Sequence, residues 1–198
     1  MIYKLVPVEQ LKALEYVFPH HLENLTKMIY KGGKIQSPLT VEKKYNIVLD
    51  GSHRHVFLCS NGFKYAPVRY VDYFNPHIRV GTHLMHRHYI DGDVGISKEE
   101  VIKRGLTGDL FPPRTTRHFF PFRKTEEINI PLAKLGKREP IDMSEHIATV
   151  AIEEEIQNNK GYLKEIDDEL FELGRYINEV IETKRYLQKQ VSEMELEI

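Results

Sequence analysis

The C-terminal part of the chain carries a repeat that restricts what it can form. From position 152 to 198, mostly apolar residues recur in alternating steps of four and three, at 152, 156, 159, 163, 166, 170, 173, 177, 180, 184, 187, 191, 194 and 198. This spacing keeps a seam on one face of a supercoiled helix. Two seam residues, Asn159 and Lys184, are polar, which costs stability but fixes register. The repeat predicts a coiled coil or helical hairpin that makes the protein a homodimer, in preference to a helix lying on its own globular domain.

Two local features bear on how this helical tail begins and continues. Ser144, before Glu145, is a suitable N-cap, and Asp142 can share that role. The NNKG segment at 158–161 is a weak point, where a helix would break or fold back because glycine and asparagine are poor helix formers.

The preceding part of the chain has a different pattern. Up to about Leu135, short apolar runs alternate with Gly, Pro and Asn, as in LVPV, SPLTV, NIVL and APVRYVDYF. These runs predict strands, with helices chiefly over 8–14 and 21–30, the second ending at Gly32-Gly33. The sequence therefore predicts an α+β domain at 1–136 and a helical coiled-coil segment at 137–198.

Composition narrows the class of protein. The chain has 198 residues, of which 41% are hydrophobic and 29% charged, enough to bury one substantial core. No apolar run reaches the ~18 residues of a membrane-spanning helix, and no signal peptide is recognisable, so we expect a cytoplasmic protein without membrane partners. The single cysteine, Cys59, is interpreted as a core residue. A net charge of -1 disfavours nucleic-acid binding.

A turn inside IVLDGSHRHVFL, residues 47–58, is the first candidate site. Asp50-Gly51 allows a tight turn, and if a helix begins at Ser52, its first N–H groups form an anion site suited to phosphate. His53 and Arg54 would add hydrogen-bond donors. The alternative is a surface Asp-Gly turn with solvated basic residues, because short motifs often match by chance.

A second segment favours the phosphate interpretation. IVLDGSHRH resembles the DGHHR box of the free L-serine kinases, and GDLFPPRTTRHFFPF at 108–122 resembles their PKTTRH signature. LVPVEQL, GGKIQSP, APVRYVDYF and INIPLAKL match the flanking segments, so the resemblance covers roughly residues 2–135. It implies a ParB/sulfiredoxin-like fold and phosphorylation of the hydroxyl of free L-serine, or of a close hydroxy amino acid, to give O-phosphoserine.

The resemblance also implies roles for individual residues. Counting back without a gap from Gly33 and Pro38 gives Glu15 the role of the base that accepts the serine proton, with Glu23 as the runner-up; either glutamate could instead be an exposed helix carboxylate. Asp50 corresponds to the acidic residue beside the reacting groups. The residues matched to phosphate binding are Gly51, Ser52, His53, Arg54, Thr115, Thr116, Arg117 and His118.

The expected co-substrate is ADP or ATP with Mg²⁺, and Asp50 is the most plausible protein contact of the metal. The sequence has no GxxxxGK[ST] motif, which argues against a P-loop fold. Archaeal members of the family have a longer segment where this chain has only 77–107, which predicts a reduced second lobe of the cleft. His83 falls where those members place a tryptophan near the substrate.

Two alternatives stay open. His83, His86 and His88, with Asp91 and Asp93, could bind a transition metal, but H-x-x-H-x-H is no standard zinc spacing. The protein could also be a ParB-like nucleotide-binding regulator, a DNA- or protein-binding switch without kinase activity. Against that, no basic DNA-reading helix is recognisable. Whether ADP or ATP is the donor, and serine the acceptor, is left open.

Overall fold

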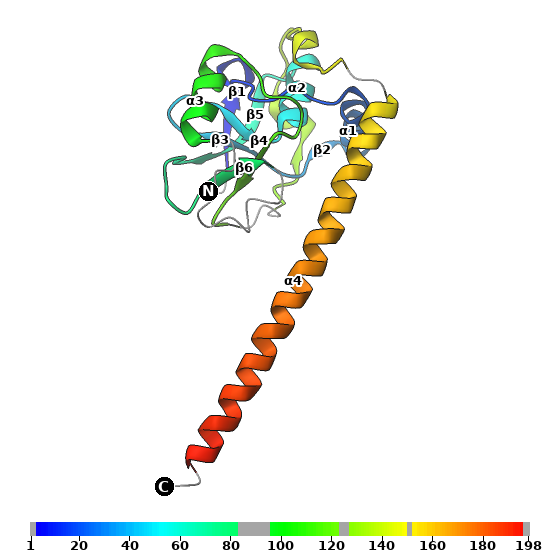
Figure 1. Cartoon of the computed structure of the whole chain (residues 1–198). Coiled ribbons are helices and arrows are strands. Elements are labelled where there is room, and N and C mark those ends of the chain that lie inside the picture. The colour runs from blue at the N-terminus through cyan, green and yellow to red at the C-terminus, as the bar shows by residue number, and fades with distance from the viewer. Residues whose placement is uncertain (1–2, 83–95, 123–126, 150–151, 196–198) are drawn as a thin grey trace. The chain divides into compact units, whose positions relative to one another are not determined.

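The computed structural model describes residues 3–82, 96–122, 127–149 and 152–195 (Figure 1). The chain divides into two compact units, Met1–Glu155 and Ile156–Ile198. In the order of the chain, with η denoting a 3-10 helix, the elements are β1 (Lys4–Pro7), η1 (Val8–Gln10), α1 (Pro19–Gly32), β2 (Lys34–Ile35), β3 (Leu39–Glu42), β4 (Val48–Asp50), α2 (Ser52–Ser60), β5 (Tyr65–Val71), β6 (Arg79–Thr82), α3 (Lys98–Thr107), β7 (Thr116–Phe119), β8 (Ile130–Pro131), η3 (Leu132–Leu135), η4 (Ser144–His146) and α4 (Ile152–Glu195).

The described strands form one four-stranded sheet and two small two-stranded sheets. In the larger sheet the order is β1-β5-β3-β4, with β5 and β3 parallel and the outer pairs antiparallel. The small sheets pair β2 with β8 and β6 with β7. The four apolar runs identified in the sequence each overlap one strand of the larger sheet, so the predicted mixed α and β architecture is confirmed.

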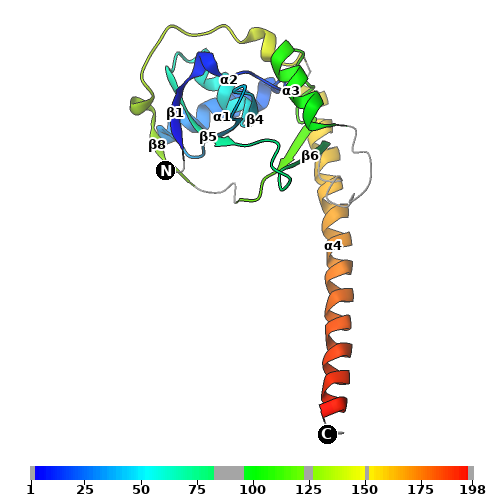
Figure 2. The same cartoon turned by 90° about the vertical axis from the view of Figure 1, so that its left-hand side faces the viewer.

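Two hydrophobic clusters surround this sheet. The first joins α2 and the ends of α1 to the strands, and Phe57 and Phe63 are among its largest members. Figure 2 shows α1 and α2 beside the larger sheet, and both helices contact each other. The second cluster packs α3 against β4, β6 and the segment around Tyr73. Cys59 belongs to the first cluster and is 1% exposed, which confirms its interpretation as a core residue.

The helix predicted over 21–30 is present as α1, and it ends at Gly33, whose φ of 63° is the left-handed conformation that glycine adopts readily. The helix predicted over 8–14 is wrong. Only η1 forms there, because the following backbone pairs with other segments: Lys12 N donates to Asn46 O, and Phe111 N donates to Leu14 O. Residues 11–17 are therefore mostly extended.

The tail helix begins later than the predicted caps Asp142 and Ser144 would place it, so that prediction is wrong. Ser144 is the first residue of the short η4, its N–H donates to Asp142 Oδ1 at 2.9 Å, and α4 begins only at Ile152. The reason is that Val17 N donates to His146 O and Ala148 N donates to Val17 O, which keeps this stretch of backbone extended.

Helix α4 runs without interruption for 44 residues. The break expected at 158–161 does not occur, and the hairpin alternative is wrong for the described part of the tail. Figure 1 shows α4 as one continuous helix. No helix among the described residues is long and apolar enough to span a membrane.

Helix α3 was not recognised from the sequence, although Ser97 and Glu100 form a readable start signal. Ser97 Oγ accepts from Glu100 N at 3.0 Å. Gly105 brings this helix close to Ile47, since a Cβ there would lie 2.6 Å from Ile47 Cδ1. This close contact packs α3 against Ile47, which directly precedes β4, the strand that ends at Asp50.

Candidate active site

The predicted turn after β4 has the geometry expected of an anion site. Asp50 ends β4, Gly51 has a φ of 100°, and α2 begins at Ser52. A Cβ at Gly51 would lie 2.7 Å from Leu39 Cδ2 and 2.9 Å from Arg54 Nη2, so the turn has room for glycine alone. The first N–H groups of α2, which have no partner within the helix, thus lie directly after the carboxylate of Asp50.

Arg54 holds this turn in place. Its Nη1 donates to Ser37 O at 2.8 Å, and its Nη2 lies 3.4 Å from Asp50 Oδ2. Burial lowers the pKa of Arg54 and Asp50 raises it, but an arginine keeps its charge in proteins. Through these two contacts Arg54 links α2 to Asp50 and to the segment before β3. Its guanidinium also places a positive charge beside the turn.

Glu15 enters the same region from the extended segment that replaces the predicted first helix. Tyr16 N donates to Phe111 O and Phe111 N donates to Leu14 O, both at 2.9 Å, and these bonds fix the backbone on either side of Glu15. The carboxylate oxygen Oε1 accepts from the N–H and from the Oγ1 hydroxyl of Thr116, each at 2.5 Å. Glu15 is thus tied to the TTRH segment, and it is not an exposed helix carboxylate.

The environment of Glu15 changes its acidity. The pKa of Glu15 is raised from 4.5 to about 7: burial is the largest cause, the hydrogen bonds from Thr116 partly oppose it, and the charge of Asp50 adds to the increase. A carboxylate with a pKa near neutrality can accept a proton and release it again at physiological pH. The contribution of Asp50 to this pKa means that its charge lies within electrostatic range of Glu15.

Glu23, the runner-up, is in a different situation. It lies on the exposed side of α1, where its Oε1 is 2.5 Å from Lys27 Nζ. The hydrogen bond and charge of Lys27 lower the pKa of Glu23. The geometry therefore favours Glu15 over Glu23 as the proton acceptor.

The TTRH segment places its side chains in different directions. Thr115 precedes β7, and its N–H donates to Pro112 O at 3.3 Å. Along β7 successive side chains point to opposite faces, so Arg117 faces away from Thr116 and His118. Only 2% of His118 is exposed, and its Nε2 lies 2.9 Å from the Tyr73 hydroxyl.

Arg117 and His118 differ from Thr116 in the residues that they contact. Arg117 Nε is buried without a hydrogen-bond partner in the described part of the chain, and its guanidinium lies 5.9 Å from the Phe119 ring. Of the four TTRH residues, the structure brings Thr116 to Glu15, whereas His118 packs against Tyr73. Phosphate contacts by Thr115, Arg117 and His118 stay predictions.

His53 lies on α2 and is largely buried. Its Nε2 accepts from Phe18 N at 3.1 Å, and its ring meets that of His21 edge to face, with 4.4 Å between centroids. Burial, together with the nearby cations His21, Arg114 and Arg54, lowers the pKa of His53 to about 3. A neutral ring that accepts at Nε2 carries its proton on Nδ1, so any hydrogen bond that His53 donates comes from Nδ1.

A cavity of about 410 Å³ opens beside this turn. Its polar wall includes Asp50, Arg54 and five further polar residues for which the sequence predicted no role, and its apolar wall comes mainly from α1 and β2. The lining residues are Leu25, Met28, Ile29, Gly32, Lys34, Ile35, Gln36, Ser37, Pro38, Thr40, Asp50, Arg54 and Arg69. Arg69 reaches this wall because β5 pairs in parallel with β3, which places Thr40 opposite Arg69. No local motif marks Arg69, since its proximity to Thr40 comes from strand pairing.

The histidine-rich segment lies outside the described residues. This applies to His83, to His86 and His88, and to the nearby Asp91 and Asp93, and hence to 83–95 within the segment 77–107 expected to form a reduced second lobe. Within the ranges that the structure describes, no three His, Cys, Asp or Glu side chains form a group that could hold a metal ion. Asp50, at the cavity wall, offers a hard oxygen ligand of the kind that Mg²⁺ prefers when phosphates supply the others.

Comparisons with known proteins agree with the sequence resemblance. No protein-family model matches the chain. A curated relative, an ATP-dependent L-serine kinase from Staphylothermus marinus, is 29% identical over 107 residues, which are 52% of this chain and 41% of the relative. The chain thus spans less than half the length of that relative.

Solved structures give the fold. A free serine kinase in complex with AMP has a TM-score of 0.59 and 17% identity, over 68% of this chain and 94% of the other. A glutamate-to-alanine variant of a free serine kinase, in complex with ADP, matches with the same TM-score and 18% identity over the same shares. SbnI with a C-terminal truncation, from Staphylococcus aureus, has a TM-score of 0.56 and 16% identity, over 83% of this chain and 96% of the other. About two thirds of this chain therefore shares the fold of the free serine kinases.

Proposed function

We propose that this protein is a small-molecule kinase that transfers a phosphoryl group from ADP or ATP to the hydroxyl of free L-serine or a close hydroxy amino acid. The observation that carries the proposal is the position of Glu15. A buried carboxylate with a pKa of about 7 lies near Asp50 and the start of α2, in a chain that shares the fold of the free serine kinases. A proton acceptor next to an anion site is what phosphoryl transfer to a hydroxyl requires.

In the proposed reaction, the serine oxygen attacks the terminal phosphorus of the nucleotide. One phosphorus–oxygen bond forms, the bond to the leaving phosphate breaks, and the hydroxyl proton passes to Glu15. Thr116 orients the carboxylate of Glu15 through its two hydrogen bonds. The N–H groups of Gly51 and Ser52 and the charge of Arg54 stabilise negative charge on the phosphoryl oxygens.

The cavity is the proposed site of the nucleoside. Ile29, Ile35 and Met28 offer apolar surface for a base, and Gln36 and Ser37 offer polar groups at its edge. We propose that Asp50 contributes one oxygen to Mg²⁺, which, when bound, neutralises charge on the phosphates. Thr115, Arg117, His53 and His118 are retained as proposed phosphate contacts, and His83 as a proposed substrate contact.

Three further proposals concern the whole chain. We interpret the fold as ParB/sulfiredoxin-like, with the kinase domain at 1–136 and the assembly segment at 137–198. The boundary between the two compact units falls later, after Glu155, because Ile141 and Ile147 pack against the first hydrophobic cluster. We also propose a homodimer through a coiled coil of the C-terminal helices, and a cytoplasmic location, where nucleotides and free amino acids are present.

The proposal is tested with the purified full chain, Mg²⁺ and either ADP or ATP against free serine, threonine and homoserine. Phosphorylated amino acid is detected directly by mass spectrometry. We expect O-phosphoserine with at least one of the two nucleotides. Nucleotide binding without any phosphorylated product would instead favour the ParB-like regulator that lacks kinase activity.

A further inference from the structure

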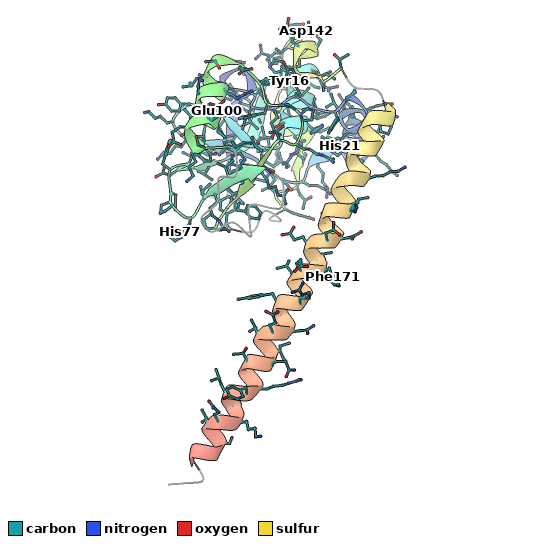
Figure 3. All side chains as sticks on the ribbon, in the orientation of Figure 1. Tyr16, His21, His77, Glu100, Asp142 and Phe171 are labelled. Carbon is teal, nitrogen blue, oxygen red and sulfur yellow. The ribbon has the colours of Figure 1, made fainter. Side chains whose placement is uncertain are left out.

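Helix α4 exposes an apolar seam along most of its described length. Six seam residues, all leucine, isoleucine or valine, are between 49% and 61% exposed; they are Leu163, Leu170, Ile177, Val180, Leu187 and Val191. Val180, Leu187 and Val191 line a shallow groove with Tyr176 and Lys184. Phe171, labelled in Figure 3, adds a further exposed aromatic ring. An apolar surface of this extent marks an interaction site.

The occupant of this seam must be a long partner helix. Over 44 residues α4 is about 66 Å long, and a helix gains most of its stability from packing of its apolar face. The strict four-three spacing fits a partner helix with the same spacing, because each seam residue then inserts between four residues of the other helix. A second copy of α4 supplies that spacing over the full length.

A second copy of α4 could pack in either of two directions. In an antiparallel pair centred near position 178, residues 167–172 of each copy lie about level with 184–189 of the other.

Lys184 distinguishes these two directions. It occupies a seam position and is exposed. In a parallel, in-register pair two Lys184 ammonium groups would meet in one layer of the seam, and like charges would repel. In the antiparallel pair the layer of Lys184 contains Leu173 of the second copy instead, so each such layer holds a single ammonium group. The same register pairs Leu170 with Leu187 and Ile177 with Val180.

From the seam and from Lys184 we infer that two copies of this chain pair through α4 in an antiparallel coiled coil, with Leu170 of each copy against Leu187 of the other. The inference specifies the dimer of the proposed function and does not depend on kinase activity. An inactive protein that forms this dimer would contradict the proposed reaction alone, and an active monomer would contradict this inference alone.

The first test combines mass and cross-linking on the full chain. Light scattering should give the mass of two chains at micromolar concentration. Under mild oxidation, Leu187→Cys alone should form almost no disulfide, whereas an equimolar mixture of Leu170→Cys and Leu187→Cys, one with an affinity tag, should form disulfide-linked heterodimers. The parent, whose Cys59 is 1% exposed, serves as the control for background oxidation.

The outcomes separate the arrangements. Strong cross-linking of Leu187→Cys to itself means a parallel pair and overturns the inference, as does a one-chain mass of the parent.

Discussion

The two halves of the candidate active site are assembled over very different distances along the chain. Asp50, Gly51 and Arg54 lie within five consecutive residues, and one turn of backbone brings them together. Glu15 and Thr116 are 101 residues apart, and they meet only because the segment around Glu15 pairs with Phe111. The first half depends on local conformation, whereas the second depends on the packing of the whole unit.

This difference separates two kinds of control over the reaction. The local half fixes where phosphate can bind, through a glycine conformation and helix N–H groups. The long-range half sets the pH range in which Glu15 can accept a proton, because burial, Asp50 and Thr116 together determine its pKa. Substitutions in the first half should therefore affect binding and folding, and those in the second should affect turnover and its pH dependence.

The largest effect is expected for Glu15→Gln. Glutamine keeps the shape and an oxygen that accepts from Thr116, but it cannot accept the serine proton, so turnover should fall by ~10²-fold or more while nucleotide affinity changes little. The measurement is steady-state kinetics together with nucleotide titration. Glu23→Gln is the matched control, since Glu23 is an exposed carboxylate paired with Lys27; if that variant is the inactive one, the assignment of the base is wrong.

The same substitution has a consequence for stability. The pKa of Glu15 is about 7 in the fold against 4.5 for an ordinary glutamate, so between these pH values the folded chain binds more protons than the unfolded chain. The free energy of unfolding of the parent should therefore decrease as pH rises from about 4.5 through 7. In Glu15→Gln this decrease should be smaller, which denaturant titration at several pH values can measure.

A second prediction concerns the local half. Gly51→Ala should lower the free energy of unfolding by about 1–3 kcal/mol, because alanine is strained at a φ of 100° and its Cβ would collide with Leu39. Thermal or urea unfolding measures the loss. Gly32→Ala is the control, since nothing lies within 4 Å of a Cβ at that position and its φ is not positive. Equal stability of the two variants would show that the turn is not constrained as described.

The contrast between local and long-range contacts also explains which parts of the site could be predicted from the sequence. The turn at Asp50-Gly51 and the helix after it depend on neighbouring residues, so the sequence predicted both. The helix expected over 8–14 was wrong because pairing of Lys12 with Asn46 and of Leu14 with Phe111 overrides local preference. Arg69 was missed since only the parallel pairing of β3 with β5 brings it to the cavity. Glu15 was found through a family resemblance, and its burial could not be read from the chain.

A third prediction joins the two halves. Asp50→Asn removes both the proposed metal contact and a negative charge near Glu15. Nucleotide affinity in the presence of Mg²⁺ should therefore weaken about tenfold, with turnover reduced as well. Nucleotide titration with and without Mg²⁺ provides the measurement, and loss of the Mg²⁺ dependence in the variant is the expected sign. A variant that binds nucleotide with the parent's Mg²⁺ dependence would remove Asp50 from the metal site.

The smallest effect, and the sharpest test of the long-range half, is expected for Thr116→Val. Valine keeps the size of threonine but removes the hydroxyl that donates to Glu15, while the N–H of residue 116 still donates. Because this hydrogen bond lowers the pKa of Glu15, its loss should raise that pKa, and turnover at neutral pH should fall several-fold. Turnover should rise with pH in the parent, with a midpoint near 7, and the midpoint of Thr116→Val should lie higher. The residual turnover of Asp50→Asn should have a lower midpoint, since the charge of Asp50 raises the pKa of Glu15. Opposite shifts in these two variants would identify Glu15 as the titrating group, whereas unchanged midpoints in both would mean that another residue accepts the proton.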